Sequence, residues 1–134
     1  MRNIAAKLQS LLRTEFVLFC CVGVANTIIH ASIVIGLVEV AGFRSTIANT
    51  AAFFAANVFS YICNARLTFK TALSARGYLR FLSSSLFVLA ATVSIAAAGE
   101  LAGVHYLVAT ACLMIVSPLS SYLLVRHFAF GKRA

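Results

Sequence analysis

Polar side chains set inside long uncharged stretches are the groups of this sequence that could do chemistry. Asn26 and His30 lie one helical turn apart, so they share a helix face. Asn57, Tyr61 and Asn64 follow an i, i+4, i+7 spacing and form a second polar stripe. Amide, phenol and imidazole groups all make hydrogen bonds. The two stripes predict either hydrogen bonds between neighbouring helices or the lining of a path for a polar substrate.

The depth of these residues favours a position near the middle of a membrane. Asn26 is ten residues past Phe16, where the first uncharged stretch begins, which corresponds to ~15 Å along a helix. Asn57 is nine residues before Arg66 and lies at a similar depth. Because a polar group costs free energy in hydrocarbon, both amides should point toward other helices. The single His30 is open to two interpretations, a donor that joins helices or a proton carrier.

Basic side chains follow the second polar stripe and recur near the end of the chain. Arg66 and Lys70 form the first group, and Arg126 and His127 form the second. A guanidinium fork matches the oxygens of a phosphate group, so the two groups together could hold a phosphorylated ligand. The alternative is that these bases only fix the orientation of the helices in the membrane.

The residue sets that enzymes need are missing from the sequence. It contains no Gly-rich phosphate loop with a Lys, no HExxH or CxxC pattern and no nucleophile elbow. The acids Glu15, Glu39 and Glu100 stand apart from one another, at the ends of the apolar stretches. The four cysteines lie within apolar stretches and are expected to be small packing residues. We therefore predict no enzyme activity, no cofactor and no metal site.

Four long apolar stretches must position these groups. With 62% hydrophobic residues, the chain is too apolar for a soluble domain. A helix needs about 20 apolar residues to cross a hydrocarbon core of about 30 Å. The predicted fold is an all-α membrane protein, a bundle of four transmembrane helices in a single domain over residues 1–134. The predicted spans are about 16–40, 46–67, 79–99 and 106–128.

The distribution of charge predicts the orientation of these spans. Ten of the eleven Lys and Arg residues lie in the two tails and the middle loop, which are on the same side of a four-span topology. Short loops rich in Lys and Arg stay cytoplasmic, so both termini are predicted to be inside. The net charge of +8 is then explained by contacts with anionic membrane lipids, and we expect no binding of nucleic acid.

The second half of the chain resembles the first. The segments SYICNARLTF at 60–69 and SYLLVRHFAF at 121–130 align at an offset of 61, with Ser, Tyr and the final Phe identical. Each half contains two spans, so a true repeat would be parallel, related by an axis along the membrane normal. The alternative is chance similarity between apolar helices. At the same offset Pro118 stands in the place of Asn57, where it should kink the fourth span.

The sequence also predicts the local structure of two further segments. Residues 1–15 could form a short interfacial helix or a basic tail without fixed structure. Ser83, Ser84 and Ser85 are expected to bond their hydroxyls to the preceding helical turn.

Two segments of the sequence resemble the signature regions of the GtrA-like family, small four-span membrane proteins of cell-surface polysaccharide synthesis. They are GVANTIIH at 23–30 and AFFAANVFSYICNARLTF at 52–69. The positions that carry the resemblance are Gly23, Asn26, Thr27, His30, Asn64, Arg66, Thr68, Phe69, Arg126, Phe128 and Phe130. The sequence departs from the family pattern at Ala65 and Leu67, and again at Val125 and His127.

The resemblance implies a protein of the bacterial cytoplasmic membrane that handles a polyprenyl-phosphate-linked sugar. Such a protein would move the lipid from the cytoplasmic to the outer leaflet. The ligand would contact Asn26, His30, Asn57, Tyr61, Asn64, Arg66, Arg126 and His127. Four short helices enclose little space, so a homodimer is expected.

Two other functions remain open from the sequence. A scaffold that anchors a glycosyltransferase would not need polar residues at mid-membrane. A small multidrug-type cation exporter matches in size and number of spans, but it needs a buried acid in its first span. No acid lies between Phe16 and Val38, which makes this alternative the weakest of the three.

Overall fold

The computed structural model describes residues 2–103 and 116–131, and helices make up nearly all of this part of the chain. The chain divides into two compact units, Met1–Leu73 and Ser74–Ala134. The boundary falls between the two similar halves of the sequence. Each unit is described below by itself.

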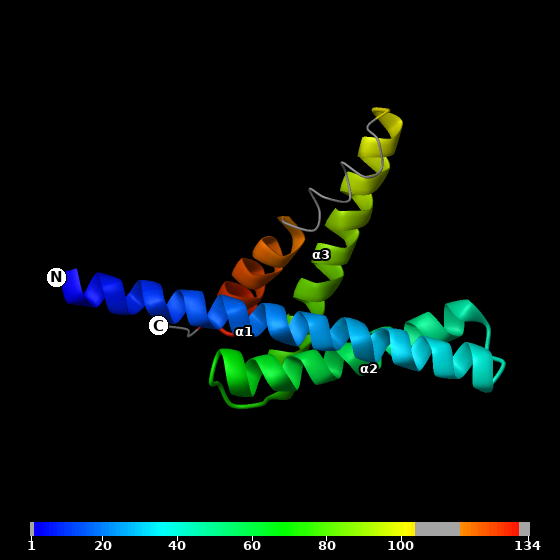
Figure 1. The fold of residues 1–134 in the computed structure, drawn as a ribbon, viewed down its shortest axis with the longest axis horizontal. Helices are drawn as coiled ribbons and strands as arrows, with labels where there is room; N and C mark the ends of the chain where they lie inside the picture. Colours follow the sequence, from blue (N-terminus) through cyan, green and yellow to red (C-terminus); the bar gives the residue numbers. More distant parts are fainter. Residues whose placement is uncertain (1, 104–115, 132–134) are drawn as a thin grey trace. The chain divides into compact units, whose positions relative to one another are not determined.

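The first unit is a helical hairpin. Helix α1, Arg2–Ile35, continues through the π-helical turn η1, Gly36–Val40, and helix α2, Ser45–Cys63, continues through a second π-helical turn, η2, Asn64–Thr68. A short turn joins the two arms, and Gly42 adopts a φ of 70° there, a conformation that favours glycine. Figure 1 shows α1 in blue beside α2 in cyan and green, and the two helices are in contact.

The N-terminal residues belong to the first long helix. Helix α1 begins at Arg2 and runs into the first apolar stretch without a break, so residues 2–15 are not a separate interfacial helix. The segment is thus helical, as one of the two expectations has it, but the helix is neither short nor separate from the first span. The apolar part of the helix that could cross a membrane extends over Ser10–Val40.

Small residues allow α2 to approach its partner helix closely. Ala48, Ala52 and Ala56 recur every fourth residue on one face and are 0%, 0% and 1% exposed. Side chains of this size let two helix backbones come together, which increases van der Waals contact in a membrane. On α1, Val22 is buried as well. The first unit is therefore held by close packing of an alanine face.

The second unit contains helix α3, Ala75–Leu101, and a further helical segment over residues 116–124 that continues into a π-helical turn, η3, Val125–Ala129. Helix α3 starts four residues before the predicted beginning at 79, because Gly77 and Tyr78 are helical rather than part of the loop. The hydroxyls of Ser83, Ser84 and Ser85 donate to the carbonyls of Leu79, Arg80 and Phe81, at 2.8, 2.9 and 3.0 Å. These are the bonds to the preceding turn that the sequence predicts.

The helices are those of a membrane protein. Within the described residues, Ser10–Val40, Ser45–Thr68 and Ala75–Gly99 are long and apolar enough to cross a bilayer. Residues 106–115 of the predicted fourth span, 106–128, lie outside the described residues, and they include residue 114, whose carbonyl a kink at Pro118 would free. The chain is thus an all-α membrane protein, as predicted. Placement of both termini in the cytoplasm stays a prediction.

Candidate binding site

A stripe of buried polar residues follows one face of α2 into η2. Asn57, Tyr61, Asn64 and Thr68 are only 6%, 5%, 1% and 3% exposed. Their burial agrees with the i, i+4, i+7 spacing, which places the first three on one helix face. The stripe begins next to the alanine face, because Asn57 directly follows Ala56. The buried residues of α2 are therefore apolar toward the hairpin turn and polar toward η2.

Asn64 is the centre of a hydrogen-bond network within this stripe. Its Nδ2 donates to the carbonyl oxygen of Ser60 at 2.9 Å and to Ser60 Oγ at 3.2 Å. Its Oδ1 accepts a hydrogen bond from Thr68 Oγ1 at 3.0 Å. A buried amide is stable only when such partners are present. The network therefore fixes the Asn64 side chain in one orientation.

The π-helical turn changes the register of the residues at the end of this stripe. The Phe69 N–H donates to the carbonyl of Asn64 at 2.8 Å, an i to i+5 bond. Turns of this kind inside α-helices occur frequently at functional sites. Beyond it, Lys70 adopts a φ of 50°, which is rare for a residue with a side chain. Arg66 is exposed in the middle of the turn. The buried polar stripe thus ends beside an exposed cation.

Asn26 on α1 differs from the neighbouring polar residues. Its Oδ1 is buried and accepts no hydrogen bond from the part of the chain that the structure describes. Thr27 is exposed and donates to the carbonyl of Gly23 at 3.1 Å, so its own helix satisfies it. A buried acceptor without a donor costs about 1–3 kcal/mol. Asn26 is therefore suited to accept a hydrogen bond from a ligand, and half-buried His30 lies one turn further along α1.

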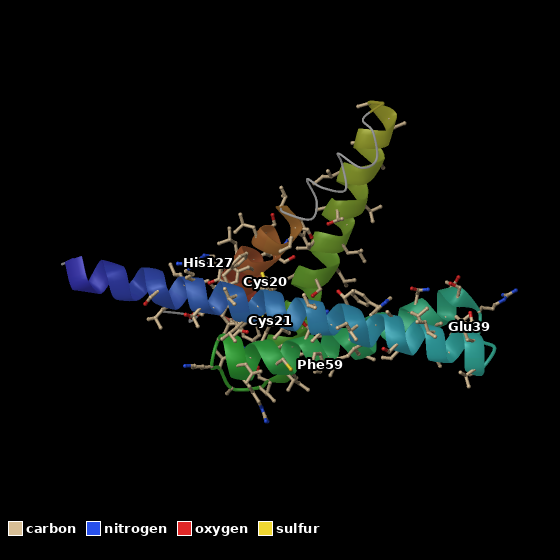
Figure 2. The ribbon with its side chains drawn as sticks, viewed as in Figure 1. Cys20, Cys21, Glu39, Phe59 and His127 are labelled. Atoms are coloured by element: carbon tan, nitrogen blue, oxygen red, sulfur yellow. The ribbon has the colours of Figure 1, made fainter. Side chains whose placement is uncertain are left out.

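In the second unit, Arg126 is held by a tyrosine. Its Nη1 donates to Tyr122 Oη at 2.6 Å, and its Cζ lies 5.8 Å from the centre of the same ring. Arg126 is half-buried and His127 is exposed. Figure 2 labels His127 in η3. Since Arg66 belongs to the first unit, the predicted joint phosphate clamp of Arg66, Arg126 and His127 stays a prediction.

The ends of the two units are built alike. The π-helical turns η2 and η3 are separated by the offset of 61 found in the sequence, and each is closed by the N–H of a Phe. The ring of Phe69 contacts Phe19 with centroids 6.4 Å apart, and the ring of Phe130 contacts Phe81 at 6.0 Å. In both units a Phe of the first helix, Phe19 in α1 or Phe81 in α3, meets the Phe that closes the π-helical turn. This shared geometry favours a true repeat over chance similarity.

The polar network is present in only one of the two copies. At the offset of 61, Val125 and Ala129 stand in the places of Asn64 and Thr68, and both are buried. The tyrosines Tyr61 and Tyr122 are equally buried, at 5% exposed each. Tyr122 is near the end of the predicted fourth span, where a tyrosine is also typical of the membrane interface, so the sequence does not single it out. Its spacing of four from Arg126 was the signal that could have identified the pair.

Other chemistry is limited in the described residues. They contain no group of three or more His, Cys, Asp or Glu that could hold a metal ion. Figure 2 shows Cys20 and Cys21 on α1, with Glu39 at the other end of the first unit, where the hairpin turns. The second unit has a cavity of about 370 Å³ between α3 and the segment 116–124. It is lined mainly by apolar side chains, with hydroxyls from Thr92, Ser117 and Ser120.

Comparison with known proteins gives one match. The family model described as GtrA/DPMS, transmembrane domain, matches residues 18–130. No curated protein and no solved structure matches the chain. The matched region begins within α1 and ends at Phe130, so it contains both π-helical endings and every predicted site residue.

Proposed function

The chain belongs to the GtrA/DPMS transmembrane-domain family, whose membrane proteins are connected with glycosyl carrier lipids, and from this premise we propose that it translocates a polyprenyl-phosphate-linked sugar. The ligand would move from the cytoplasmic to the outer leaflet of a bacterial cytoplasmic membrane, for cell-surface polysaccharide synthesis. Both chain termini would face the cytoplasm.

The observation that carries this proposal is the buried polar stripe of α2 and η2. Lipid tails offer no partners to Asn57, Tyr61 and Asn64, so in a protein that serves only as an anchor such a stripe would have to be used for hydrogen bonds within the bundle. Sugars carry many hydroxyls that hydrogen-bond with amides and phenols. Asn26, with its unpaired buried Oδ1, provides an acceptor on the helix that packs against α2. His30 extends this second polar face.

The phosphate would be bound at the basic ends of the units. Arg66 is exposed beside the stripe, and Arg126 is half-buried with exposed His127 next to it. A guanidinium makes paired hydrogen bonds with phosphate oxygens. The prenyl tail would remain in the surrounding lipid. Since the units are short, a homodimer would provide a more enclosed route for the sugar.

Transfer of this kind needs no nucleotide. The sequence has no nucleotide-binding loop. An inside-negative potential favours outward movement of one negative charge by about 2.3 kcal/mol per 100 mV. Consumption of the sugar lipid at the outer surface would keep the net flow outward.

A leaflet-transfer assay tests the proposal. Vesicles with and without the purified protein are loaded with a labelled prenyl-phosphate sugar in both leaflets, and the label in the outer leaflet is removed chemically. The protein should speed the loss of the inner pool, and Arg66→Ala should slow this loss. A loss of the inner pool at the same rate as in empty vesicles would rule out the proposed transport function.

The alternative function is a scaffold that holds a glycosyltransferase at the membrane. This function predicts that the enzyme co-purifies with the chain and that Asn26→Ala has no effect on polysaccharide synthesis. The proposed transporter requires the opposite result for Asn26→Ala. A multidrug-type cation exporter has less support, because Glu39 is exposed at the hairpin end of the first unit rather than buried within its first span.

A further inference from the structure

Arg126 is oriented by a rigid neighbour rather than by solvent. Tyr122 is 5% exposed, and its hydroxyl accepts the hydrogen bond of Arg126 Nη1 at 2.6 Å. The guanidinium carbon lies 5.8 Å from the centre of the same ring, within the range of a cation–π contact. A buried tyrosine has few side-chain rotations left. Because the guanidinium is a planar fork, a bond to one nitrogen orients the whole plane.

The repeat provides an internal comparison for this pair. Tyr61 occupies the place of Tyr122 and is equally buried, but Ala65 occupies the place of Arg126 and is 0% exposed. The arginine of the η2 turn, Arg66, comes one residue after Ala65 and is exposed. The tyrosine is therefore common to both endings, whereas an arginine four residues after it occurs in the second unit alone.

The polar residues of the two endings differ in a complementary way. The first ending has the network of half-buried Ser60 with buried Asn64 and Thr68, which contains amide and hydroxyl groups but no charge. The second has Val125 and Ala129 at the positions of Asn64 and Thr68, together with the Tyr122–Arg126 pair. Neutral hydrogen-bonding groups are thus concentrated in one copy, and an oriented cation occurs in the other.

We propose that Tyr122 is a positioning residue that aims the Arg126 guanidinium at the phosphate group of a membrane lipid. This inference rests on the proposed function and deepens it, because it assigns the phosphate to the second unit. An arginine already held in one orientation loses less side-chain freedom when the ligand binds, which raises affinity. The phenol acts only through Arg126 and makes no contact with the phosphate itself.

A double-mutant cycle on binding tests this role. The full chain in detergent is titrated with farnesyl phosphate, and the variants are Tyr122→Phe, Arg126→Gln and the two combined. We expect Tyr122→Phe to weaken binding about fivefold and Arg126→Gln to weaken it more. In the Arg126→Gln background, Tyr122→Phe should have no further effect. Additive losses, or unchanged binding in either single variant, would overturn the proposal.

Two further measurements separate positioning from a structural role. Farnesol, which lacks the phosphate, should bind Tyr122→Phe and the wild type equally, whereas a misfolded variant would lose both probes. Tyr78→Phe removes a phenol hydroxyl of the same unit and should leave farnesyl phosphate binding unchanged. If Tyr122→Phe does not fold, Arg126→Lys keeps the charge without the fork, and it should reproduce the fivefold loss. Undiminished binding by Arg126→Lys would count against the inference.

Competition identifies the source of the phosphate group. Phosphatidic acid and inorganic phosphate are each added to the farnesyl phosphate titration. Competition by phosphatidic acid alone would assign the pair to bulk lipid headgroups and overturn the link to the prenyl ligand. Weak competition by both phosphatidic acid and inorganic phosphate would support the assignment of the Tyr122–Arg126 pair to the prenyl ligand. The two proposals can fail separately. If the double-mutant cycle shows coupling between Tyr122 and Arg126 but the protein does not speed leaflet transfer, the role of Tyr122 stands and the transport function is ruled out.

Discussion

At the residue scale, Asn64 shows how a polar group can be both structural and available for function. It is 1% exposed, and its amide joins Ser60 to Thr68 across two helical turns. The other repeat makes the same π-helical ending with Val125 and Ala129, so the ending does not need this network in order to fold. The geometry of the π-helical ending therefore does not explain why the first unit has Asn64 and Thr68 at these positions.

The repeat supplies a matched variant for this residue. In Asn64→Val combined with Thr68→Ala, the first ending acquires the residues of the second. We expect the variant to fold normally and to transfer the labelled prenyl-phosphate sugar about tenfold more slowly, a loss that corresponds to ~1.4 kcal/mol. Leaflet transfer and thermal unfolding are measured on the same preparation. Normal transfer by a folded variant would contradict a role for the network in transport.

Lys70 carries a conformational cost that a substitution can reveal. Its φ of 50° costs a residue with a side chain roughly 1–2 kcal/mol, and glycine does not have this cost. We predict that Lys70→Gly raises the stability of the protein in detergent by about 1 kcal/mol, measured by thermal unfolding. Lys70→Ala is the control, because it removes the charge and keeps the strained backbone. Equal stability of the two variants would show that the backbone conformation is not strained.

At the element scale, the alanine face of α2 determines how closely the first hairpin packs. Ala52 is 0% exposed, whereas Ala51 and Ala55 on the same helix are exposed. A large side chain at Ala52 must push α1 away or distort α2, which costs about 1–3 kcal/mol. The face is thus a packing surface, and it holds α1 against the polar stripe that follows it.

Paired substitutions test this packing. Ala52→Leu should lower the thermal unfolding temperature of the purified protein, because the added side chain has no space at the helix contact. Ala51→Leu and Ala55→Leu add the same volume on the exposed side and should change the stability little. A similar loss in all three variants would indicate that the effect comes from the helix itself and not from its contact with α1.

The elements also show what the sequence can and cannot predict. Hydropathy and charge predict long apolar helices, and α1, α2 and α3 confirm them, because uncharged runs of this length have few other stable forms. The π-helical turns could not be predicted, since one extra residue in a turn leaves the apolar pattern almost unchanged. The start of α3 at Ala75 was missed because Gly77 resembled a loop signal, although helices tolerate a single glycine.

At the scale of the whole molecule, the chain is two related units that have diverged. The offset of 61 relates η2 to η3 and Phe69 to Phe130, and each of these two rings contacts a Phe of the first helix of its own unit. The polar stripe could be predicted from spacing alone because Asn57, Tyr61 and Asn64 belong to one helix. The Tyr122–Arg126 contact was missed because a tyrosine near a span end is also common at the membrane interface.

Orientation in the membrane is a property of the whole molecule that charge predicts. Fusions of a periplasm-active reporter to the N-terminus or the C-terminus should both be inactive, and cytoplasm-active fusions at the same sites should be active. A fusion at the turn around Gly42 should give the reverse result. A reporter that works in the periplasm at either end would contradict the positive-inside assignment.

Transfer of a charged lipid under an imposed potential is the most direct test of the central claim. Vesicles that contain the protein and a labelled prenyl-phosphate sugar are given an inside-negative diffusion potential of ~100 mV, which corresponds to ~2.3 kcal/mol for one charge. The account predicts rapid redistribution of the label toward the outer leaflet, by up to about fiftyfold at equilibrium. Redistribution of the label that is no faster than in empty vesicles would contradict the account.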